Sequence, residues 1–423
     1  MKKLLVLFAK EFPYNHSEPF LEAEYPLYKQ YFDKVLIVTN RPTAGGPRGK
    51  KTREVSDEAV EILESCFNLD LKHKLAFVWA ILSDKRTYSE LFRILFRHKA
   101  NLTAIRRLLT SIGKANLCVE LAHKRCQELA AEGYEPVGAY AYWLIYPAYA
   151  AVKFNRKYYG GRLYTVSRAH RFDLYENRNP GGYILCREYI LGGLDEIASI
   201  SDDGRRYLEQ THPDVPMNIT IHHLGAKDVG VSKPVEKGDV FKIVSCARAV
   251  PVKRIHRMVD ALAKMPDVSI EWTHCGGGAL LEEIKEKASA LPPNIRCIFT
   301  DTIPNTAVYE LYRDNDYHVF VNVSQSEGVP VSIMEAMSFG LPVIATDVGG
   351  TAETIDVGNS GYLLGEEYAD EELVEYLYRL IRMSQEDYDA MRRRAREKFE
   401  QDYNAIPNYH KFLQSLREHT NKN

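Results

Sequence analysis

The segment EGVPVSIMEAMSFGLPVIATDVGGTAE, which starts at Glu327, holds the residues best suited to chemistry. Two carboxylates, Glu327 and Glu335, stand eight positions apart, with Pro330 between them. Proline favours the first turn of a helix, so we expect a helix from Pro330 to about Phe339, before the next glycine. The unpaired N–H groups at a helix start bind phosphate, and Glu335 lies about 7.5 Å further along the axis. This spacing fits a nucleoside diphosphate, with phosphates at the helix start, ribose on Glu335 and an attached sugar near Glu327.

A pair of cations follows an expected strand where the chain reads VSCARAVPVKR, residues 244–254. Arg248 and Lys253 lie at the carboxyl end of this strand, the edge at which parallel α/β sheets bind ligands. Their charge would stabilise a leaving diphosphate, because negative charge grows on it as its bond to a sugar breaks. Without further context, such an arginine and lysine, like two glutamates eight apart, are more often a solvated surface.

Length and composition limit what kind of protein can hold these groups. A chain of 423 residues favours two domains. The 55 basic and 57 acidic residues lack the basic excess of nucleic-acid-binding proteins. Seven cysteines without a C-x-x-C pair are typical of a reducing compartment. No apolar run approaches the roughly 20 residues of a membrane span, so we expect a cytoplasmic protein.

Strand-like and helix-like runs alternate, which favours an α/β protein with parallel sheets. The expected strands are Lys3–Ala9, Val35–Thr39, Val137–Tyr142, Leu163–Ser167, Glu196–Ser201, Thr220–His223, Phe241–Ser245, Ser269–Cys275, Ile295–Phe299, Val319–Val323 and Val343–Thr346. Ser201 is the expected N-cap of a following helix. The expected domains are residues 1–224 and 240–395, with a linker at 225–239 and a charged final helix at 396–423.

Residues 240–365 resemble the donor-site signature of retaining family 4 glycosyltransferases of the GT-B fold, of the bacterial polysaccharide-biosynthesis type. That signature has Glu-Gly, apolar residues, Glu-Ala-Met, Gly-x-Pro-Val-Ile-Ala-Thr and Gly-Gly, and its cations follow a Gly-Arg-Leu-x3-Lys-Gly pattern. The resemblance implies two Rossmann-like domains facing an interdomain cleft, the first for the acceptor and the second for a nucleotide sugar. Ala247, Arg254 and Asp301 stand where the family usually has glycine, which puts the geometry of those loops in doubt.

The resemblance also implies residue roles. Glu327 would be catalytic, holding a donor-sugar hydroxyl, and His170, in SRAHRFDLY, would lie near the reacting centre. The implied donor-binding residues are Arg248, Lys253, Ile303, Gly328, Val329, Pro330, Val331 and Glu335, with Ile303 against the base. Candidate acceptor or supporting residues are His16, Arg168, Arg171 and Asp173. A lone histidine near a strand end is more often structural, so the role of His170 depends on its position in the motif.

The implied reaction moves a hexose from a nucleotide sugar to a glycan hydroxyl, with retention. The acceptor would be a lipid-linked intermediate in exopolysaccharide, capsule or O-antigen assembly. The leaving phosphate would itself take the acceptor's proton, so no enzymic nucleophile is required. There is no Asp-x-Asp motif, and we expect no metal or other cofactor. Two alternatives stay open: a nucleotide-sugar epimerase of the same fold, and a non-catalytic glycan-assembly protein with a relic site.

Residues Lys72 to Lys114 include ten basic residues, opposed only by Asp84 and Glu90. Apolar residues are interleaved with them, which predicts a basic, amphipathic helical insertion at about 70–115. Such a segment could lie on an anionic membrane surface, making the enzyme peripheral on the inner face of the cytoplasmic membrane. The alternative is a basic solvent face whose apolar side packs on its own domain.

Overall fold

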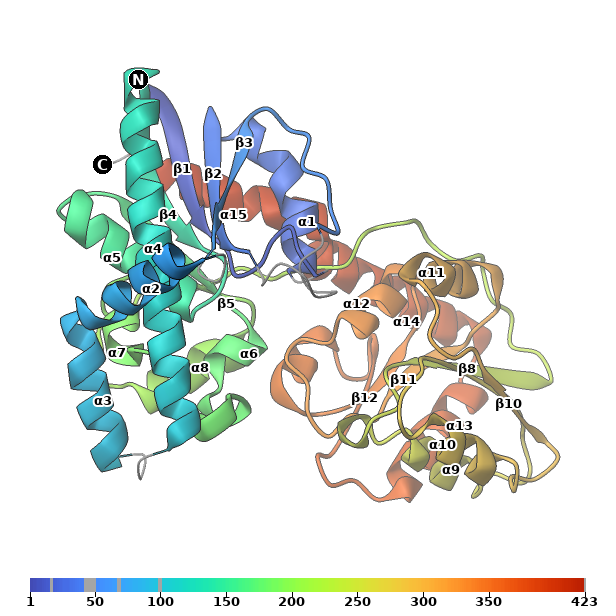
Figure 1. Ribbon diagram of the computed structural model, residues 1–423. Coiled ribbons are helices and arrows are strands. Elements are labelled where there is room, and N and C mark those ends of the chain that lie inside the picture. Colours follow the sequence, from blue (N-terminus) through green and yellow to red (C-terminus); the bar gives the residue numbers. More distant parts are fainter. Residues whose placement is uncertain (16–17, 42–50, 67–69, 98–100, 422–423) are drawn as a thin grey trace. The chain divides into compact units, whose positions relative to one another are not determined.

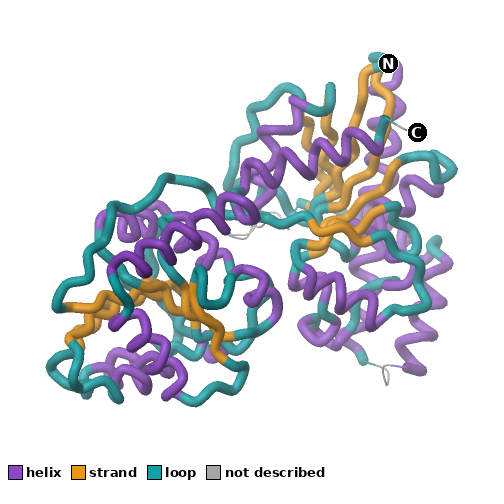
Figure 2. The backbone as a smooth tube through the Cα atoms, turned by 180° about the vertical axis from the view of Figure 1, so that it is seen from behind, coloured by secondary structure: helices purple, strands orange, loops and turns teal. Residues whose placement is uncertain are grey.

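Strands and helices alternate along the chain, as the sequence predicts, in a computed structural model that describes residues 1–15, 18–41, 51–66, 70–97 and 101–421. The chain forms two units: unit 1 is Met1–His222 with Tyr409–Asn423, and unit 2 is His223–Asn408. Each unit has its own parallel sheet (Figure 1). In each, helices cover both faces of the strands (Figure 2). The expected α/β class with two Rossmann-like halves is therefore confirmed.

The sheet of unit 1 has the strand order β3-β2-β1-β4-β5-β6-β7. Its strands are β1 (Lys2–Phe8), β2 (Lys34–Asn40), β3 (Val60–Ser65), β4 (Tyr134–Ala141), β5 (Tyr164–Ala169), β6 (Glu196–Ser199) and β7 (Ile219–Ile221). All neighbours pair in parallel, and the order changes direction between β1 and β4. Ligands bind to such sheets at this switch point, outside the carboxyl ends of the strands. The sequence did not predict β3, an edge strand whose charged residues hide its pattern.

The helices of unit 1 include a long central one. They are α1 (Pro19–Glu24), α2 (Leu71–Leu82), α3 (Lys85–Arg97), α4 (Leu102–Ala131), α5 (Tyr146–Tyr158), α6 (Arg171–Leu174), α7 (Arg187–Leu191), α8 (Asp202–Thr211) and, from Tyr409 on, α15 (Ala405–His419). Ser201 caps α8 as predicted, because its hydroxyl accepts a hydrogen bond from the Gly204 N–H at 3.1 Å. The helical insertion predicted at about 70–115 corresponds to α2, α3 and the first half of α4. Helix α4 extends to Ala131, beyond the predicted end, because it is a core helix.

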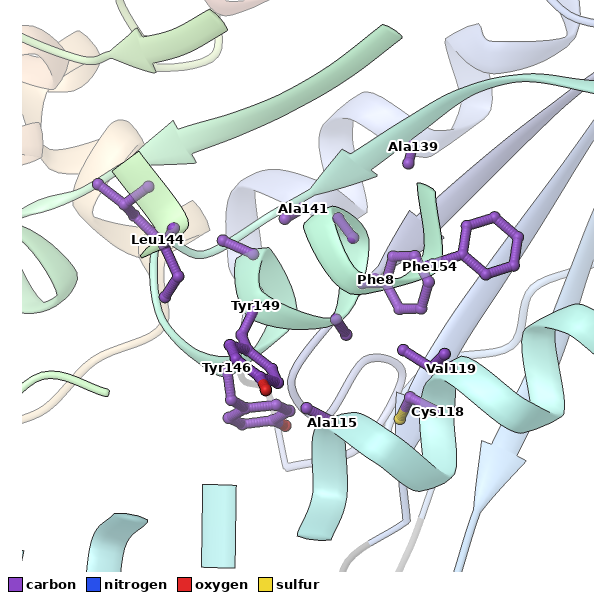
Figure 3. Packing of buried hydrophobic residues seen from close by; sticks show 14 of the residues in the cluster. Phe8, Ala115, Cys118, Val119, Ala139, Ala141, Leu144, Tyr146, Tyr149 and Phe154 are labelled. Atoms are coloured by element: carbon purple, nitrogen blue, oxygen red, sulfur yellow. The ribbon is translucent and has the colours of Figure 1, made fainter. Parts of the chain in front are cut away.

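The core of unit 1 forms where α4 and α5 pack on the sheet (Figure 3). The rings of Phe8 on β1 and Phe154 on α5 meet edge to face, with centroids 5.7 Å apart. Small side chains such as Ala115 on α4 and Ala139 on β4 let the layers approach closely. Burying one large aromatic side chain contributes about 1.5–3 kcal/mol. This packing fixes the switch-point loops that follow β1 and β4.

The sheet of unit 2 has the strand order β10-β9-β8-β11-β12-β13, again parallel. Its strands are β8 (Val240–Cys246), β9 (Ser269–Cys275), β10 (Ile295–Phe299), β11 (Val319–Asn322), β12 (Val343–Thr346) and β13 (Gly361–Leu364). The switch point lies between β8 and β11. The sequence did not predict β13, which begins at Gly361, where a Cβ would lie 2.0 Å from the Val343 carbonyl oxygen.

The helices of unit 2 are α9 (His256–Leu262), α10 (Leu281–Ala288), α11 (Asn305–Asp314), α12 (Val331–Ser338), α13 (Asp370–Arg382) and α14 (Gln385–Lys398), with short turns η5 (Pro251–Lys253) and η6 (Gly349–Thr354). Helix α12 is the helix that the sequence predicts after Pro330, which is its N-cap. Gly340 ends it with a φ of 72°, a conformation that favours glycine. The core of this unit is built around Trp272, which is fully buried.

Candidate functional site

Three loops of unit 2 converge at the carboxyl ends of β8, β9 and β10. Gly276 and Gly278 follow β9, and a Cβ on them would lie 2.0 Å from the Ala247 oxygen and 2.4 Å from the Ala249 oxygen. Glycine is therefore required here for the backbones to approach. The loops enclose a pocket of about 180 Å³. Its lining residues are Cys246, Ala247, Arg248, Cys275, Gly276, Gly277, Thr302, Ile303 and Val308.

Two predicted donor-binding residues, Arg248 and Ile303, line this pocket together. Arg248 is exposed, and within the described residues no carboxylate forms an ion pair with it. Asp301, one of the residues found in place of a family glycine, adopts the left-handed conformation that glycine would, with φ 59°. Its carboxylate accepts a hydrogen bond from the Thr302 N–H at 2.8 Å. An aspartate tolerates this conformation better than most residues, so the turn survives the replacement.

A lysine and a glutamate meet at the switch point of unit 2. The Lys253 Nζ lies 2.5 Å from the Glu327 Oε1, and the Asn322 amide donates to the same oxygen at 3.3 Å. Lys253 ends the loop after β8, whereas Glu327 lies in the loop after β11. Glu327 is buried, with 8% of its surface exposed. The structure thus brings together the residue predicted to bind the diphosphate and the residue predicted to hold the sugar.

Arg254, the second replacement of a family glycine, also lies in the left-handed region, with φ 49°. Its guanidinium donates hydrogen bonds to the carbonyl oxygens of Val323, Ser324 and Glu366 at 3.0–3.3 Å. Such bonds from a charged donor offset the backbone strain of a left-handed arginine, which is about 1–3 kcal/mol. The side chain therefore ties the loop after β8 to the loop after β11.

Glu335 lies on α12 and is largely buried. Its Oε1 accepts hydrogen bonds from the Asn305 amide at 2.9 Å and from the Tyr309 hydroxyl at 3.1 Å. Burial raises the pKa of Glu335 above its ordinary value, and these two hydrogen bonds only partly oppose that rise. Both bonds end on Oε1, so Oε2 is the oxygen left to face a donor such as a ribose hydroxyl. The sequence did not predict Asn305 and Tyr309 as partners, because they stand 30 and 26 positions away.

The loop that contains Gly328, Val329, Pro330 and Val331 is supported from behind by the Gly-Gly pair. A Cβ on Gly349 would lie 2.3 Å from the Glu327 carbonyl oxygen, and its φ is 56°. The Gly350 N–H donates to the Gly328 carbonyl at 2.7 Å. The N–H groups of the first turn of α12 have no partner within the helix and can bind an anion.

In unit 1, His170 directly follows β5 and is buried, with 6% of its surface exposed. Its ring packs on that of Trp143, with centroids 4.5 Å apart. Its backbone N–H donates to the Asp173 Oδ1 at 2.6 Å. The ring Nδ1 lies 3.5 Å from the Asp173 Oδ2, but within the described residues neither ring nitrogen forms a hydrogen bond. An unsatisfied buried polar group costs about 1–3 kcal/mol, so such an imidazole suits a site that a ligand completes.

The candidate acceptor residues fall in different environments. Arg168 is fully buried, and its guanidinium donates to Glu24 at 2.8 Å and to the Tyr140 hydroxyl at 2.9 Å. Asp173 is also fully buried and accepts from the Leu144 N–H. Both residues support the sheet edge around His170, and neither can contact an acceptor directly. Arg171 is partly exposed at the start of α6, and His16 lies outside the described residues.

The residues that the structure describes bear on metal binding and on membrane spanning. No group of three or more His, Cys, Asp or Glu side chains there could hold a metal ion. Whether the reaction needs a metal therefore stays a prediction. Among the same residues, no helix is both long and apolar enough to cross a bilayer.

A family match falls within unit 2. Residues 231–398 match the family model described as glycosyl transferases group 1. The putative colanic acid biosynthesis glycosyltransferase WcaL of Salmonella typhimurium is 27% identical over 180 residues, covering 40% of this chain and 42% of the relative. The O-antigen biosynthesis glycosyltransferase WbnH of Escherichia coli is 31% identical over 176 residues, covering 42% and 46%. The chain matches less than half the length of these relatives.

Solved structures match the whole chain. The lipopolysaccharide outer core galactosyltransferase WaaB has a TM-score of 0.65 at 15% identity, covering 98% of this chain and 99% of its own. Anabaena Alr3699/HepE in complex with UDP-glucose has a TM-score of 0.60 at 14% identity, covering 99% and 100%. At these identities the likeness shows the fold, which is GT-B, as the sequence predicts. The chain therefore has the GT-B fold, and its residues 231–398 are similar to the group 1 glycosyl transferases.

Proposed function

We propose that the protein is a retaining hexosyltransferase that uses a nucleotide sugar as donor and a glycan hydroxyl as acceptor. One observation supports this most strongly: Lys253 and Glu327 meet at the switch point of unit 2, in a chain that also buries Glu335 on α12. A site for diphosphate, sugar and ribose needs a cation and two carboxylates in this arrangement.

The donor is held along its length in this proposal. Ile303 contacts the base, Oε2 of Glu335 accepts from the ribose, and Arg248, Lys253 and the N–H groups of the α12 start bind the diphosphate. Glu327 accepts from a sugar hydroxyl and stabilises positive charge on the sugar ring. The leaving phosphate oxygen takes the acceptor's proton as the new glycosidic bond forms on the same face. His170 orients the donor sugar through a ring nitrogen.

The proposed acceptor is a lipid-linked glycan in bacterial polysaccharide assembly. Two relatives are described as colanic acid and O-antigen biosynthesis glycosyltransferases, which supports this class of acceptor. We propose no metal or cofactor, because two cations and a helix start already oppose the charge of the diphosphate.

We propose in addition that unit 1 binds the anionic inner leaflet of the cytoplasmic membrane. The two helices α2 and α3 leave one apolar face each exposed. The exposed apolar residues are Leu71, Leu75, Val78, Trp79 and Leu82 on α2, and Tyr88, Phe92, Leu95 and Phe96 on α3. Exposed Lys72 and Lys74 lie in the first turn of α2, and exposed Lys85 is the first residue of α3. Apolar side chains bordered by lysines match an anionic lipid surface in both components.

A panel of nucleotide sugars tests the reaction. We expect one donor to raise the melting temperature and to release its nucleoside diphosphate only when a glycan acceptor is added. The same rate in EDTA would agree with a metal-free reaction. Conversion of the donor to another nucleotide sugar without acceptor would instead identify an epimerase. A protein that neither binds nor turns over any donor would be a non-catalytic assembly protein.

A further inference from the structure

Unit 1 contains a pocket of about 430 Å³ that the donor reaction does not use. Lys10 comes from the loop after β1, and Ile145 and Tyr146 come from the loop after β4. These two loops flank the switch point of unit 1, where such a sheet binds ligands. The long helix α4 closes the pocket with Arg106, Arg107, Ser111 and Lys114, among others. Its volume is typical of a small-molecule site.

The pocket is strongly basic. It is lined by four cations, Lys10, Arg106, Arg107 and Lys114, and by no carboxylate. Over the described part of the chain, no acidic side chain forms an ion pair with Lys10, Arg106 or Arg107. The charge of Glu11 acts on Lys114, but burial outweighs it and lowers the pKa of Lys114.

The orientation of one cation is already set. The Arg107 Nη2 donates to the Asn179 Oδ1 at 2.7 Å, and burial lowers the pKa of Arg107. Partly buried cations without counter-charges are costly, and a bound anion would remove that cost. Arginine side chains held in one orientation are suited to the planar, bidentate binding of phosphate.

One side of the pocket wall is largely apolar, whereas Thr103, Thr110 and Ser111 add hydroxyl groups on α4. The apolar side includes Ile145, Phe172, Tyr183, Ile184 and Leu185, beside the cations of α4. A free inorganic anion would leave this wall unused. A ligand that carries both an anionic group and an apolar chain would cover both parts. One further apolar side chain lies next to the pocket, since Leu102, just before the pocket residue Thr103, is 80% exposed.

The pocket shares its loops with the catalytic histidine. The His170 ring packs on Trp143, which stands two positions before the pocket residue Ile145 and three before Tyr146. Phe172 of the pocket follows His170 by two positions, and the Lys10 Nζ lies 5.9 Å from its ring centroid. A ligand anchored in the pocket would therefore present its next group toward the loop that contains His170.

We propose that this pocket binds the phosphate or diphosphate ester that joins the acceptor glycan to its apolar chain. The inference rests on the proposed function and adds to it an anion subsite for the acceptor, formed by Lys10, Arg106, Arg107 and Lys114. The donor diphosphate has the same chemistry, so the experiment must separate the two sources.

Calorimetry with farnesyl diphosphate, a soluble isoprenoid diphosphate, tests the subsite without requiring the natural acceptor. We expect the full-length protein to bind it, and Arg106→Gln with Arg107→Gln to weaken binding at least tenfold, since one hydrogen bond to a charged group is lost at each position. Lys124→Gln, a change of an exposed cation on the same helix outside the pocket, is the matched control and should leave binding unchanged. Farnesol, without phosphate, should bind at least tenfold more weakly.

UDP distinguishes the acceptor subsite from the donor site. Lys253→Ala should weaken UDP binding but leave farnesyl diphosphate binding unchanged, whereas the arginine double variant should do the reverse. Because Arg106 is exposed, Arg106→Gln alone gives a second variant if the double variant fails to fold. Loss of farnesyl diphosphate binding in Lys253→Ala, or equal binding in wild type and arginine variants, would overturn the proposal. A protein that binds the probe through these arginines yet transfers no sugar would keep the subsite and refute the transferase.

Discussion

The two switch points of this chain have the same strand topology but differ in whether their cations form ion pairs. In unit 2, Lys253 and Glu327 contact each other at 2.5 Å, so the cation already has a carboxylate partner. In unit 1, Lys10, Arg106 and Arg107 line a pocket without forming an ion pair among the described residues. The lysine of one switch point is therefore paired with a carboxylate, whereas these three cations of the other are not.

This difference separates two kinds of binding. In the proposed function, a donor that enters unit 2 would replace Glu327 as the partner of Lys253, which would free the carboxylate for the sugar. Donor binding and activation of the carboxylate would then be coupled in one exchange. The pocket of unit 1 needs no such exchange at Lys10, Arg106 or Arg107, because no acidic side chain among the described residues forms an ion pair with them. It would bind an anion by charge and shape.

Breaking the unit 2 pair should have the largest effect. We expect Lys253→Ala to reduce turnover by about 100-fold or more, roughly 3 kcal/mol, because it removes one preorganised charge from the leaving diphosphate. Glu327→Ala should also lower turnover, with a smaller effect on nucleotide affinity. Steady-state kinetics at saturating donor measure both. Lys285→Ala, which breaks a 2.7 Å ion pair with Glu282 elsewhere in unit 2, is the control. Nearly unchanged turnover in Lys253→Ala would exclude its role.

The next largest effect is expected on membrane binding, which we assign to the surface of unit 1 and not to that of unit 2. Changing Lys72, Lys74 and Lys85 to Gln should weaken binding to anionic liposomes by about 2–3 kcal/mol, since each basic residue near such a surface contributes about 1 kcal/mol. Binding should also decrease with salt and with Trp79→Ala. Co-sedimentation with anionic and with neutral vesicles measures it. The control carries Lys227, Lys233 and Lys264, all exposed on unit 2, changed to Gln. Wild-type protein that stays in the supernatant at low salt would exclude membrane binding.

A smaller effect is expected at Glu335, where burial raises the pKa. The folded state favours the protonated carboxyl, so its contribution to stability is present at acidic pH and is lost as pH rises through the folded pKa. Glu335→Gln should therefore raise the melting temperature at neutral pH, with the gain shrinking toward pH 4. It should also weaken nucleoside diphosphate binding by about tenfold, or 1.4 kcal/mol. Unchanged affinity in calorimetry would contradict the ribose assignment.

The sequence predicted the helices and strands around the candidate donor site well, because the local sequence determines each of them. Pro330 before a helix-forming run, and Gly340 after it, give the bounds of α12 within one residue. The strands with continuous apolar runs were equally clear. Two strands were missed for local reasons: β3 mixes charged with apolar residues at a sheet edge, and β13 begins with a glycine.

The sequence could not predict which of these parts touch. Lys253 and Glu327 stand 74 positions apart, and they meet only because β8 and β11 are neighbours in the sheet. The doubt about loops that lack the family glycines is resolved by Arg254 and Asp301, which both take left-handed backbone conformations. The carbonyl bonds of Arg254 depend on tertiary structure and leave no local pattern. The basic pocket was hidden for the same reason, since its cations come from Lys10 and from α4.

The last helix, α15, determines which fragments of the protein can fold on their own. Phe412, Leu413 and Leu416 of α15 are buried in the same cluster as Leu5 and Tyr140 of the first sheet. Unit 2 is one uninterrupted stretch and is the natural fragment for isolated expression, whereas a fragment that stops at residue 222 would lack part of its own interior. That fragment should need residues 405–421 supplied as a separate peptide to become fully folded. Complementation of this kind would give a direct assay for how strongly the terminal helix stabilises unit 1.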